Sequence, residues 1–183
     1  MGGSCWLIQA NGTRVKGPEA TSNFAVVPSG FHFRGALVYS VEQAFQAAKF
    51  PAGSPAFLRV ASIAPLQDDP DSSQHGMACW QAGQERAALV PDWARVKVGV
   101  MLEACRAKVA AVAAVREALL ATGACQIEGG PSTGWSFQGR EHGWQQWNGR
   151  IQMLLREELR EEAQRTPGLL ASLQALFAEY ESG

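Results

Sequence analysis

The longest regular pattern in the sequence runs from Trp93 to roughly Leu120. Apolar residues recur there at three- and four-residue spacing, which is the period of a helix with one buried face. The residues that carry the pattern are Val96, Val100, Met101, Ala104, Val109 and Val112. Gly123 follows as a natural C-terminal cap. We therefore expect either one long helix or two helices that break near Ala107–Val109.

Shorter patterns of apolar, aromatic and β-branched residues predict a few strands. A turn at Asn11-Gly12 ends the first of them, and a turn at Pro28-Ser29-Gly30 joins the next two. The expected strands are Cys5–Ile8, Phe24–Val27, Phe31–Val38 and Cys125–Glu128.

Further helices are predicted from caps and amphipathic spacing. Ser40 is a good N-cap with Gln43 at the third helical position, and this helix should end at Phe50-Pro51. Weaker or later helices are expected at Pro55–Ile63, at Met77–Ala88, from near Asn148 to about Arg165, and at Leu169–Tyr180. We expect a solvated loop at Gln67–Gly76. We expect a solvated helix face at the charge run Arg156–Glu162.

These elements predict an α+β fold, as a compact, helix-rich single domain with a few short strands. The length of 183 residues fits one domain. We assign residues 1–165 to this domain and residues 166–183 to a C-terminal helical extension that packs on it.

Composition excludes several classes of protein. The chain has 16 Lys and Arg against 17 Asp and Glu, which argues against a protein that coats nucleic acid. Apolar runs such as Val109–Val115 are too short to cross a membrane. The four cysteines have no paired spacing, so we expect free thiols in a cytoplasmic protein. We expect no metal, no cofactor and no obligate protein partner.

Glu42 is the first candidate for chemistry. It falls at the second position of the helix that follows Ser40, where backbone N–H groups and the helix dipole stabilise a carboxylate. Gln46 and Lys49 share its face. This arrangement suits the stabilisation of a developing cation or the orientation of a water molecule. The alternative is an ordinary Glu in a first helical turn.

Three other segments are candidates for ligand binding. Ser22-Asn23-Phe24 either hydrogen-bonds and stacks a heterocycle or forms a plain turn. Trp93 with Lys97 one turn later either stacks a base beside a phosphate or packs as core with a snorkelling lysine. Glu128 precedes a Gly-rich loop that ends at Trp135, and glycines let a backbone approach a ligand closely.

Taken together, these segments resemble the NADAR (YbiA-like) family. The resemblance covers roughly residues 20–160 in a consistent order and is most specific in the segment Glu-x-x-Phe-Gln-x-x-Lys-Phe that begins at Glu42. The other matching residues are Ser22-Asn23-Phe24, Asp92-Trp93, Lys97, Met101, Ala104, Lys108, Leu119–Gly123, Ile127-Glu128, Trp135, Gly149, Met153 and Arg156.

The resemblance implies a hydrolase of N-glycosidic bonds that needs no metal. Known activities of the family are cleavage of ribosylated pyrimidine intermediates of riboflavin synthesis and removal of ADP-ribose from guanine bases. It implies that Glu42 is the catalytic carboxylate, with Asn23, Phe24, Trp93 and Trp135 around the ligand. The expected partner is an ADP-ribosylated nucleobase or another ribosylated heterocycle, with nucleic acid contacted through a single modified base.

The sequence departs from the family pattern in the loop before Trp135. Family members usually carry an Asp a few residues before this Trp and a Gly after it. Here the segment from Pro131 has no Asp, and Ser136 follows the Trp. Glu128 is the candidate to take the place of the Asp, and Thr133 is a candidate to position water. A non-catalytic module that binds ADP-ribose or a nucleotide is the alternative from another class.

Overall fold

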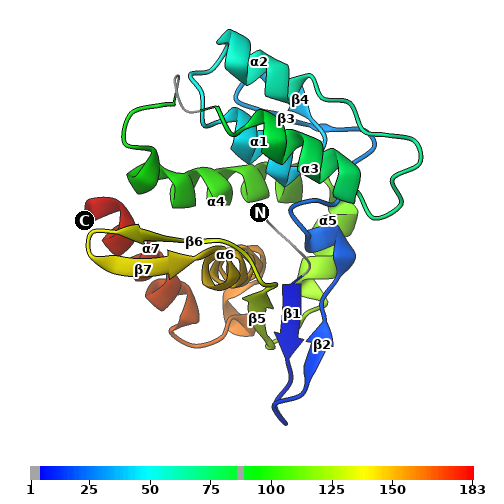
Figure 1. Cartoon of the computed structure of the whole chain (residues 1–183). Coiled ribbons are helices and arrows are strands. Elements are labelled where there is room, and N and C mark those ends of the chain that lie inside the picture. The colour runs from blue at the N-terminus through cyan, green and yellow to red at the C-terminus, as the bar shows by residue number, and fades with distance from the viewer. Residues whose placement is uncertain (1–4, 86–88) are drawn as a thin grey trace. The chain divides into compact units, whose positions relative to one another are not determined.

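A computed structural model describes residues 5–85 and 89–183, which fall into two compact units (Figure 1). The first unit is residues 23–111, and the second combines residues 5–22 with 112–183. Helices dominate and the strands are short and antiparallel, which confirms the predicted α+β class. The division into residues 1–165 and an extension of residues 166–183 stays a prediction.

The first unit is built around the short helix α1, Val41–Ala47, in which every residue is buried. It packs against α2 (Pro55–Ala61), α3 (Ser73–Ala82) and α4 (Trp93–Ala111). The hairpin of β3 (Phe31–Phe33) and β4 (Ala36–Val38) completes the unit.

The start of α1 is fixed by the predicted cap. Ser40 Oγ accepts from Gln43 N at 3.1 Å, and Gln43 Oε1 accepts from Tyr39 N at 2.7 Å. Gln43 Nε2 also donates to the carbonyls of Val60 and Ala61 at the end of α2. The Gln43 side chain thus ties the first turn of α1 to its neighbouring helix.

Three expectations for the first unit are corrected. Phe24–Val27 is not a strand. Phe31–Val38 is a hairpin of two strands and not one strand, because Arg34 and Gly35 adopt positive φ angles of 47° and 82° and turn the chain back. The stretch Gln67–Gly76 is only partly a loop, because α3 begins at Ser73. The predicted helix Met77–Ala88 is α3, which ends at Ala82, and residues 86–88 lie outside the described residues.

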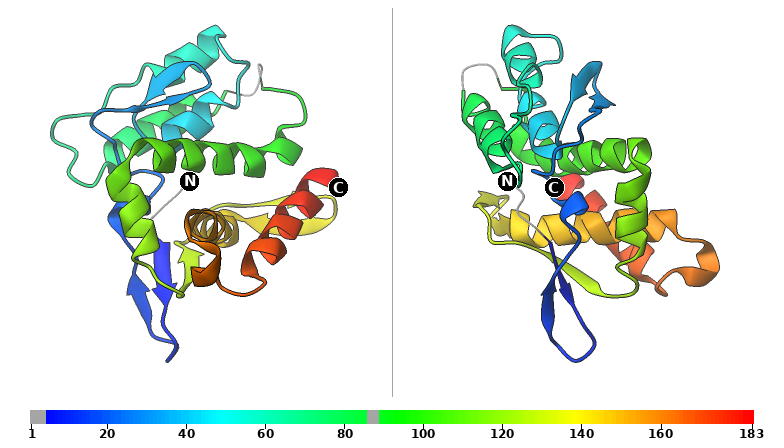
Figure 2. Two further views of the ribbon diagram at one scale, coloured as in Figure 1. Left: turned by 180° about the vertical axis from the view of Figure 1, so that it is seen from behind. Right: turned by 90° about the vertical axis from the view of Figure 1, so that its right-hand side faces the viewer.

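The second unit contains a three-stranded sheet in the order β2-β1-β5, with the β1–β2 ribbon drawn in blue in Figure 2. Its strands are β1 (Cys5–Ile8), β2 (Arg14–Lys16) and β5 (Gln126–Gly129). The other elements are the 3-10 turns η1 (Glu19–Thr21) and η2 (Glu162–Gln164), the helices α5 (Ala113–Leu120), α6 (Trp144–Leu159) and α7 (Leu169–Ser182), and the strands β6 (Gly134–Phe137) and β7 (Arg140–Gly143).

Helix α6 is the centre of the second unit and lies against β5 and α7. Its contact with β5 depends on Gly149, because a Cβ atom there would lie 2.2 Å from the carbonyl oxygen of Ile127. Leu173, Phe177 and Tyr180 form the buried stripe of α7.

The structure also corrects several boundaries in the second half of the chain. The long helical pattern does break, but at Val112, whose φ of −120° and ψ of 104° are extended, rather than near Ala107–Val109. The helix expected from near Asn148 to about Arg165 is α6, which begins at Trp144 and ends at Leu159. The hairpin β6–β7 was not predicted; its turn places Gln138 and Gly139 at φ angles of 52° and 72°.

The prediction that Arg156–Glu162 is a solvated face is wrong for its first two residues. Arg156 and Glu157 are both 0% exposed, and Arg156 Nε donates to Glu157 Oε1 at 3.1 Å. Arg160 Nη1 reaches the same oxygen at 3.0 Å, and Thr166 N donates to Glu157 Oε2 at 2.8 Å. The pair therefore anchors the segment that follows α6.

No helix in the described residues is long and apolar enough to cross a membrane. The four cysteines are free thiols, and all except Cys125 are buried.

Candidate functional site

The candidate site in the first unit is centred on Glu42, whose side chain is 0% exposed in the first turn of α1. Gln46 Nε2 donates to Glu42 Oε1 at 2.7 Å, as their spacing of one helical turn predicts. The backbone N–H of Glu42 donates to Asn23 O at 2.9 Å. The carboxylate is therefore held by its own helix and by the Asn23 segment.

Lys49 supplies a positive charge on the same side of α1. Burial lowers the pKa of Lys49, and the nearby Glu42 carboxylate opposes that shift. Lys49 Nζ donates to Gly83 O at 2.8 Å, which fixes the ammonium group at the end of α3. Attraction between the buried carboxylate and this partly buried ammonium offsets part of the cost of removing each from water.

Residue 83 must lack a side chain to leave room for Gln46. A Cβ atom at this position would lie 2.1 Å from Gln46 Oε1 and 2.9 Å from Gln46 Cβ. The Gln46 amide can therefore reach Glu42 only while residue 83 has no side chain.

Lys97 adds a second positive charge from α4. Burial lowers the pKa of Lys97 to about 8, and repulsion from Lys49 contributes to the shift. Two partly buried lysines that repel each other would both be stabilised by an anionic group bound between them. Lys49 and Lys97 thus bring two like charges within electrostatic reach of each other.

The segment that carries Asn23 and Phe24 is held by one face of α4. Asn23 Nδ2 lies 3.4 Å from Met101 Sδ, and Cys105 Sγ lies 3.7 Å from Asn23 Oδ1. Lys108 Nζ donates to Ala25 O at 3.2 Å. Met101, Cys105 and Lys108 follow helical spacing, so a single helix face positions the segment that contacts Glu42.

Aromatic side chains border the same helices. The Trp93 ring lies 5.2 Å from the Phe45 ring of α1, with the planes tilted by 49°, and Trp93 is partly exposed. Phe24 covers Gly76 of α3, where a Cβ atom would approach its ring to 2.5 Å. Trp93 is therefore the candidate surface for stacking, while Phe24 packs closely on α3.

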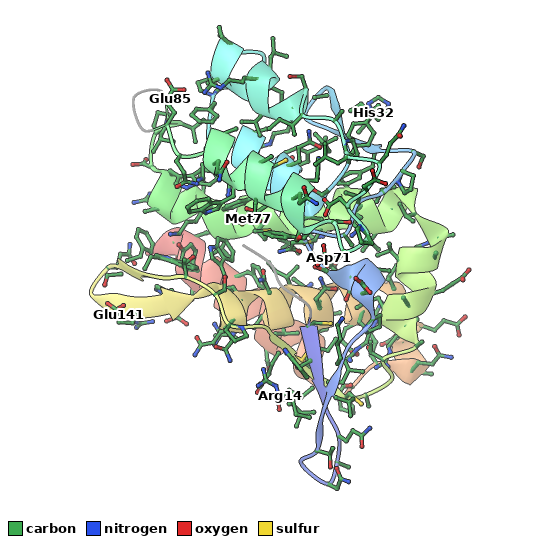
Figure 3. The ribbon with its side chains drawn as sticks, turned by 45° about the vertical axis from the view of Figure 1, so that its right-hand side comes forward. Arg14, His32, Asp71, Met77, Glu85 and Glu141 are labelled. Atoms are coloured by element: carbon green, nitrogen blue, oxygen red, sulfur yellow. The ribbon has the colours of Figure 1, made fainter. Side chains whose placement is uncertain are left out.

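The remaining candidates belong to the second unit. Ser22 is buried just after η1. Glu128 on β5 lies 4.0 Å from Arg14 of β2, which Figure 3 labels, and it lines a cavity of about 430 Å³ with Gln126 and Arg150. Trp135 on β6 donates through Nε1 to the Tyr180 hydroxyl at 3.1 Å.

The contacts within the first unit link Glu42 with Asn23, Gln46 and Lys49, and link Lys49 with Lys97. Ser22, Glu128 and Trp135 belong to the other unit, where each has its own surroundings. Among the described residues, no group of three or more His, Cys, Asp or Glu side chains could hold a metal ion.

A solved structure with a similar chain is the solution NMR structure of the Escherichia coli protein YbiA. The two sequences are 30% identical, the match covers 76% of this chain and 77% of YbiA, and the TM-score is 0.56. The chain belongs to the NADAR (YbiA-like) family. No family model matches the chain, and no curated protein does.

Two residues that help to form the site, Lys108 and Gly83, were not among the site residues predicted from the sequence. Lys108 and Gly83 lie outside the Glu42 helix but fix the position of Asn23–Ala25 and of Gln46. The sequence did point to Lys108, because it is one of the residues of the α4 segment that match the NADAR family. The contact of Gly83 with Gln46 depends on the approach of α3 to α1, two segments that are separated in the sequence.

The loop between β5 and β6 is where the sequence departs from the NADAR family pattern. This loop, residues 130–133, contains no Asp, and Trp135 lies on a regular strand that pairs with β7. Trp135 stacks on His142, with ring centroids 5.7 Å apart and an angle of 23° between the planes. In this family member the loop Trp is thus part of an aromatic cluster in its own unit.

Proposed function

We propose that this protein hydrolyses an N-glycosidic bond, with Glu42 as the catalytic carboxylate. The substrate that we infer is an ADP-ribosylated guanine base or a related ribosyl adduct. Family membership supports the reaction type, and the surroundings of Glu42 support its role. The observation that carries the proposal is a fully buried carboxylate that accepts a hydrogen bond from Gln46 and lies close to Lys49.

The proposed chemistry requires a negative charge next to the sugar. Cleavage of the C1′–N bond passes through an oxocarbenium-like transition state, with positive charge on C1′ and O4′ of the ribose. A carboxylate held in a site from which water is excluded stabilises this charge more strongly than one in water. Because Gln46 fixes one carboxylate oxygen, Glu42 is oriented before substrate binds.

In the proposed reaction a water oxygen forms a bond to C1′ while the C1′–N bond breaks. The electron pair of that bond goes to the ring nitrogen of the base, which then takes up a proton. Glu42 accepts the proton that the attacking water releases. Glu128 is the candidate proton donor to the base, and Thr133 is the candidate to position water.

Binding of the substrate is assigned to the remaining candidates. Lys49 and Lys97 receive a phosphate, which would offset their mutual repulsion. Trp93 supplies a ring face for a base, together with Asn23, Phe24 and Ser22. Trp135 is the candidate for a second stacking surface. Any nucleic acid is then held through one modified base, in keeping with the formal net charge of −1.

Two other functions fit specific observations. Hydrolysis of a ribosylaminopyrimidine phosphate, an intermediate of riboflavin synthesis, would use the same carboxylate and the same lysines. A module that binds ADP-ribose or a nucleotide without cleaving it is favoured by the loop before Trp135, which contains no Asp. In each case we expect a cytoplasmic protein that needs no metal.

The test incubates the purified protein separately with ADP-ribosylated DNA and with ribosylaminopyrimidine phosphate, and measures the sugar released. We expect release from the DNA, almost complete loss of release in Glu42→Gln, and unchanged release in Glu181→Gln, an exposed Glu on α7. Release from the pyrimidine alone would select the second substrate. Binding of ADP-ribose without release from either substrate would select the binding module, and full activity of Glu42→Gln would contradict the assignment.

A further inference from the structure

The second unit contains a hollow that the proposed reaction does not use. It has a volume of about 210 Å³ and lies among the β6–β7 hairpin, α6 and α7. Aromatic side chains from all three regions line it, together with Gln146 and Arg150 of α6. The aromatic residues are Phe137, His142, Trp147 and Tyr180.

Arg150 supplies a positive charge to this hollow. Its guanidinium carbon lies 4.8 Å from the centroid of the Trp147 ring, which is 2% exposed and therefore holds the guanidinium in place. Burial lowers the pKa of Arg150. Across residues 5–85 and 89–183, the guanidinium group of Arg150 forms no hydrogen bond or ion pair, so an anion bound there would offset the cost of its burial.

The carboxylates that also line the hollow are engaged by other groups. Glu179 forms an ion pair with Arg140, and Glu141 accepts from the hydroxyl of Ser136. Arg150 is therefore the group in the hollow that is suited to attract an anion.

The rings around Arg150 are arranged to contact another ring. Tyr180 meets His142 at 5.0 Å and 85°, and meets Trp147 at 5.1 Å and 70°. Edge-to-face contacts of this kind are a preferred geometry for aromatic pairs and fix the rings relative to one another. The hollow thus combines aromatic walls with a cation that is fixed on one of them.

We propose that this hollow binds a small molecule in which an aromatic ring is joined to a phosphate or a carboxylate. The anionic group contacts Arg150, and the ring packs against Tyr180 and Phe137. Gln146 contributes an amide at the edge of the hollow. The site belongs to the other unit, differs in chemistry from the Glu42 cluster and does not depend on the proposed reaction.

The test is a titration of ¹⁵N-labelled protein followed by NMR. The probes are adenosine 5′-monophosphate, phenylacetate and, as the uncharged counterpart, adenosine. We expect saturable shifts of backbone amides in residues 137–150 and 176–180 with at least one anionic probe. Adenosine should bind about ten- to a hundredfold more weakly, since it lacks the charge-assisted hydrogen bonds to Arg150. The anionic probe that binds shows whether the site takes a phosphate or a carboxylate.

Three variants separate this site from the Glu42 cluster. Arg150→Gln should remove the shifts in residues 137–150, Arg150→Lys should retain part of the affinity, and Lys97→Gln should leave these shifts unchanged. The unperturbed remainder of each spectrum shows that the variant is folded. The proposal is overturned if no anionic probe shifts these amides, if Arg150→Gln binds as tightly as the unmodified protein, or if Lys97→Gln abolishes the shifts.

Discussion

Gln46 donates from Nε2 to Glu42 Oε1 over 2.7 Å, and both side chains are almost completely buried. The other end of the same amide, Oε1, has no hydrogen-bond donor among the described residues and lies against Gly83. The amide therefore acts toward Glu42 as a donor and holds this carboxylate oxygen in one position. A carboxylate in a fixed orientation is what the proposed reaction requires.

Replacement of this donor should affect both stability and activity. In Gln46→Ala, Glu42 Oε1 loses its hydrogen bond inside the protein, so we expect a decrease of about 1–3 kcal/mol in the free energy of unfolding. Turnover should fall by about 10- to 100-fold, because the carboxylate is no longer held in one orientation. Urea unfolding and sugar release measure the two effects. Gln81→Ala, at an exposed position of α3, is the control, and an equal effect there would contradict the argument.

Gly83→Ala should also disturb the contact between Gln46 and Glu42. The new methyl group would require Gln46 to move away from Glu42, at a cost of about 1–3 kcal/mol for overpacking. Gly143→Ala is the matched control, because a Cβ atom there meets nothing within 4 Å. Thermal unfolding of both variants tests the prediction. Equal melting temperatures would show that residue 83 does not restrict Gln46.

The free energy of unfolding should rise with pH just above pH 8. Burial lowers the pKa of Lys97 and of Lys108 from 10.5 to about 8, so in this range the unfolded chain binds more protons than the folded protein. Above pH 9 the buried thiols of Cys79 and Cys105 oppose this trend, because burial raises the pKa of each from 9.0 to about 12.

Urea unfolding between pH 7.5 and pH 9.5 measures this dependence. We expect a rise between about pH 8 and pH 9 that levels off above pH 9. Lys108→Met should reduce the rise, whereas Lys16→Met, at an exposed position of β2, should leave it unchanged. An identical pH dependence in Lys108→Met and the unmodified protein would rule out Lys108 as its source.

The ion pair at the end of α6 should matter strongly for stability. Glu157→Gln leaves the buried guanidinium of Arg156 without its carboxylate, and the expected cost is about 3–5 kcal/mol. Glu161→Gln changes an exposed residue of the same charge run and should have little effect. Chemical denaturation compares them. Similar midpoints for the two variants would mean that burial of the pair contributes little.

Sequence reasoning succeeded where the structure depends on neighbouring residues. The capping of α1 by Ser40 and the spacing of Glu42 and Gln46 on one helix face are short-range properties, and the structure confirms both. The helix ends at Ala47 rather than at Phe50-Pro51, so Lys49 lies in the turn that follows it. The functional roles given to these residues stay predictions. Strand β1 was predicted with its observed bounds, Cys5–Ile8.

The features that were missed depend on contacts between distant segments. The run Arg156–Glu162 has the composition of a solvated face, but Thr122 and the Cys125 carbonyl accept from Arg156 and thereby allow its burial. The position of Asn23 depends on Met101 and Cys105, far away in the sequence. Such partners are set by helix packing, which no local pattern encodes.

The pairing of β1 with β5 has a consequence for synthesis of the chain. Cys5 pairs with Gly129, and the whole first unit, residues 23–111, is encoded between the two strands. At roughly 5–20 residues per second, the ribosome needs on the order of 6–24 s to make the intervening segment. The first unit is therefore made before β5, and throughout that time β1 has only β2 as a neighbouring strand. The nascent chain thus carries a two-stranded ribbon with an unpaired edge until β5 is made.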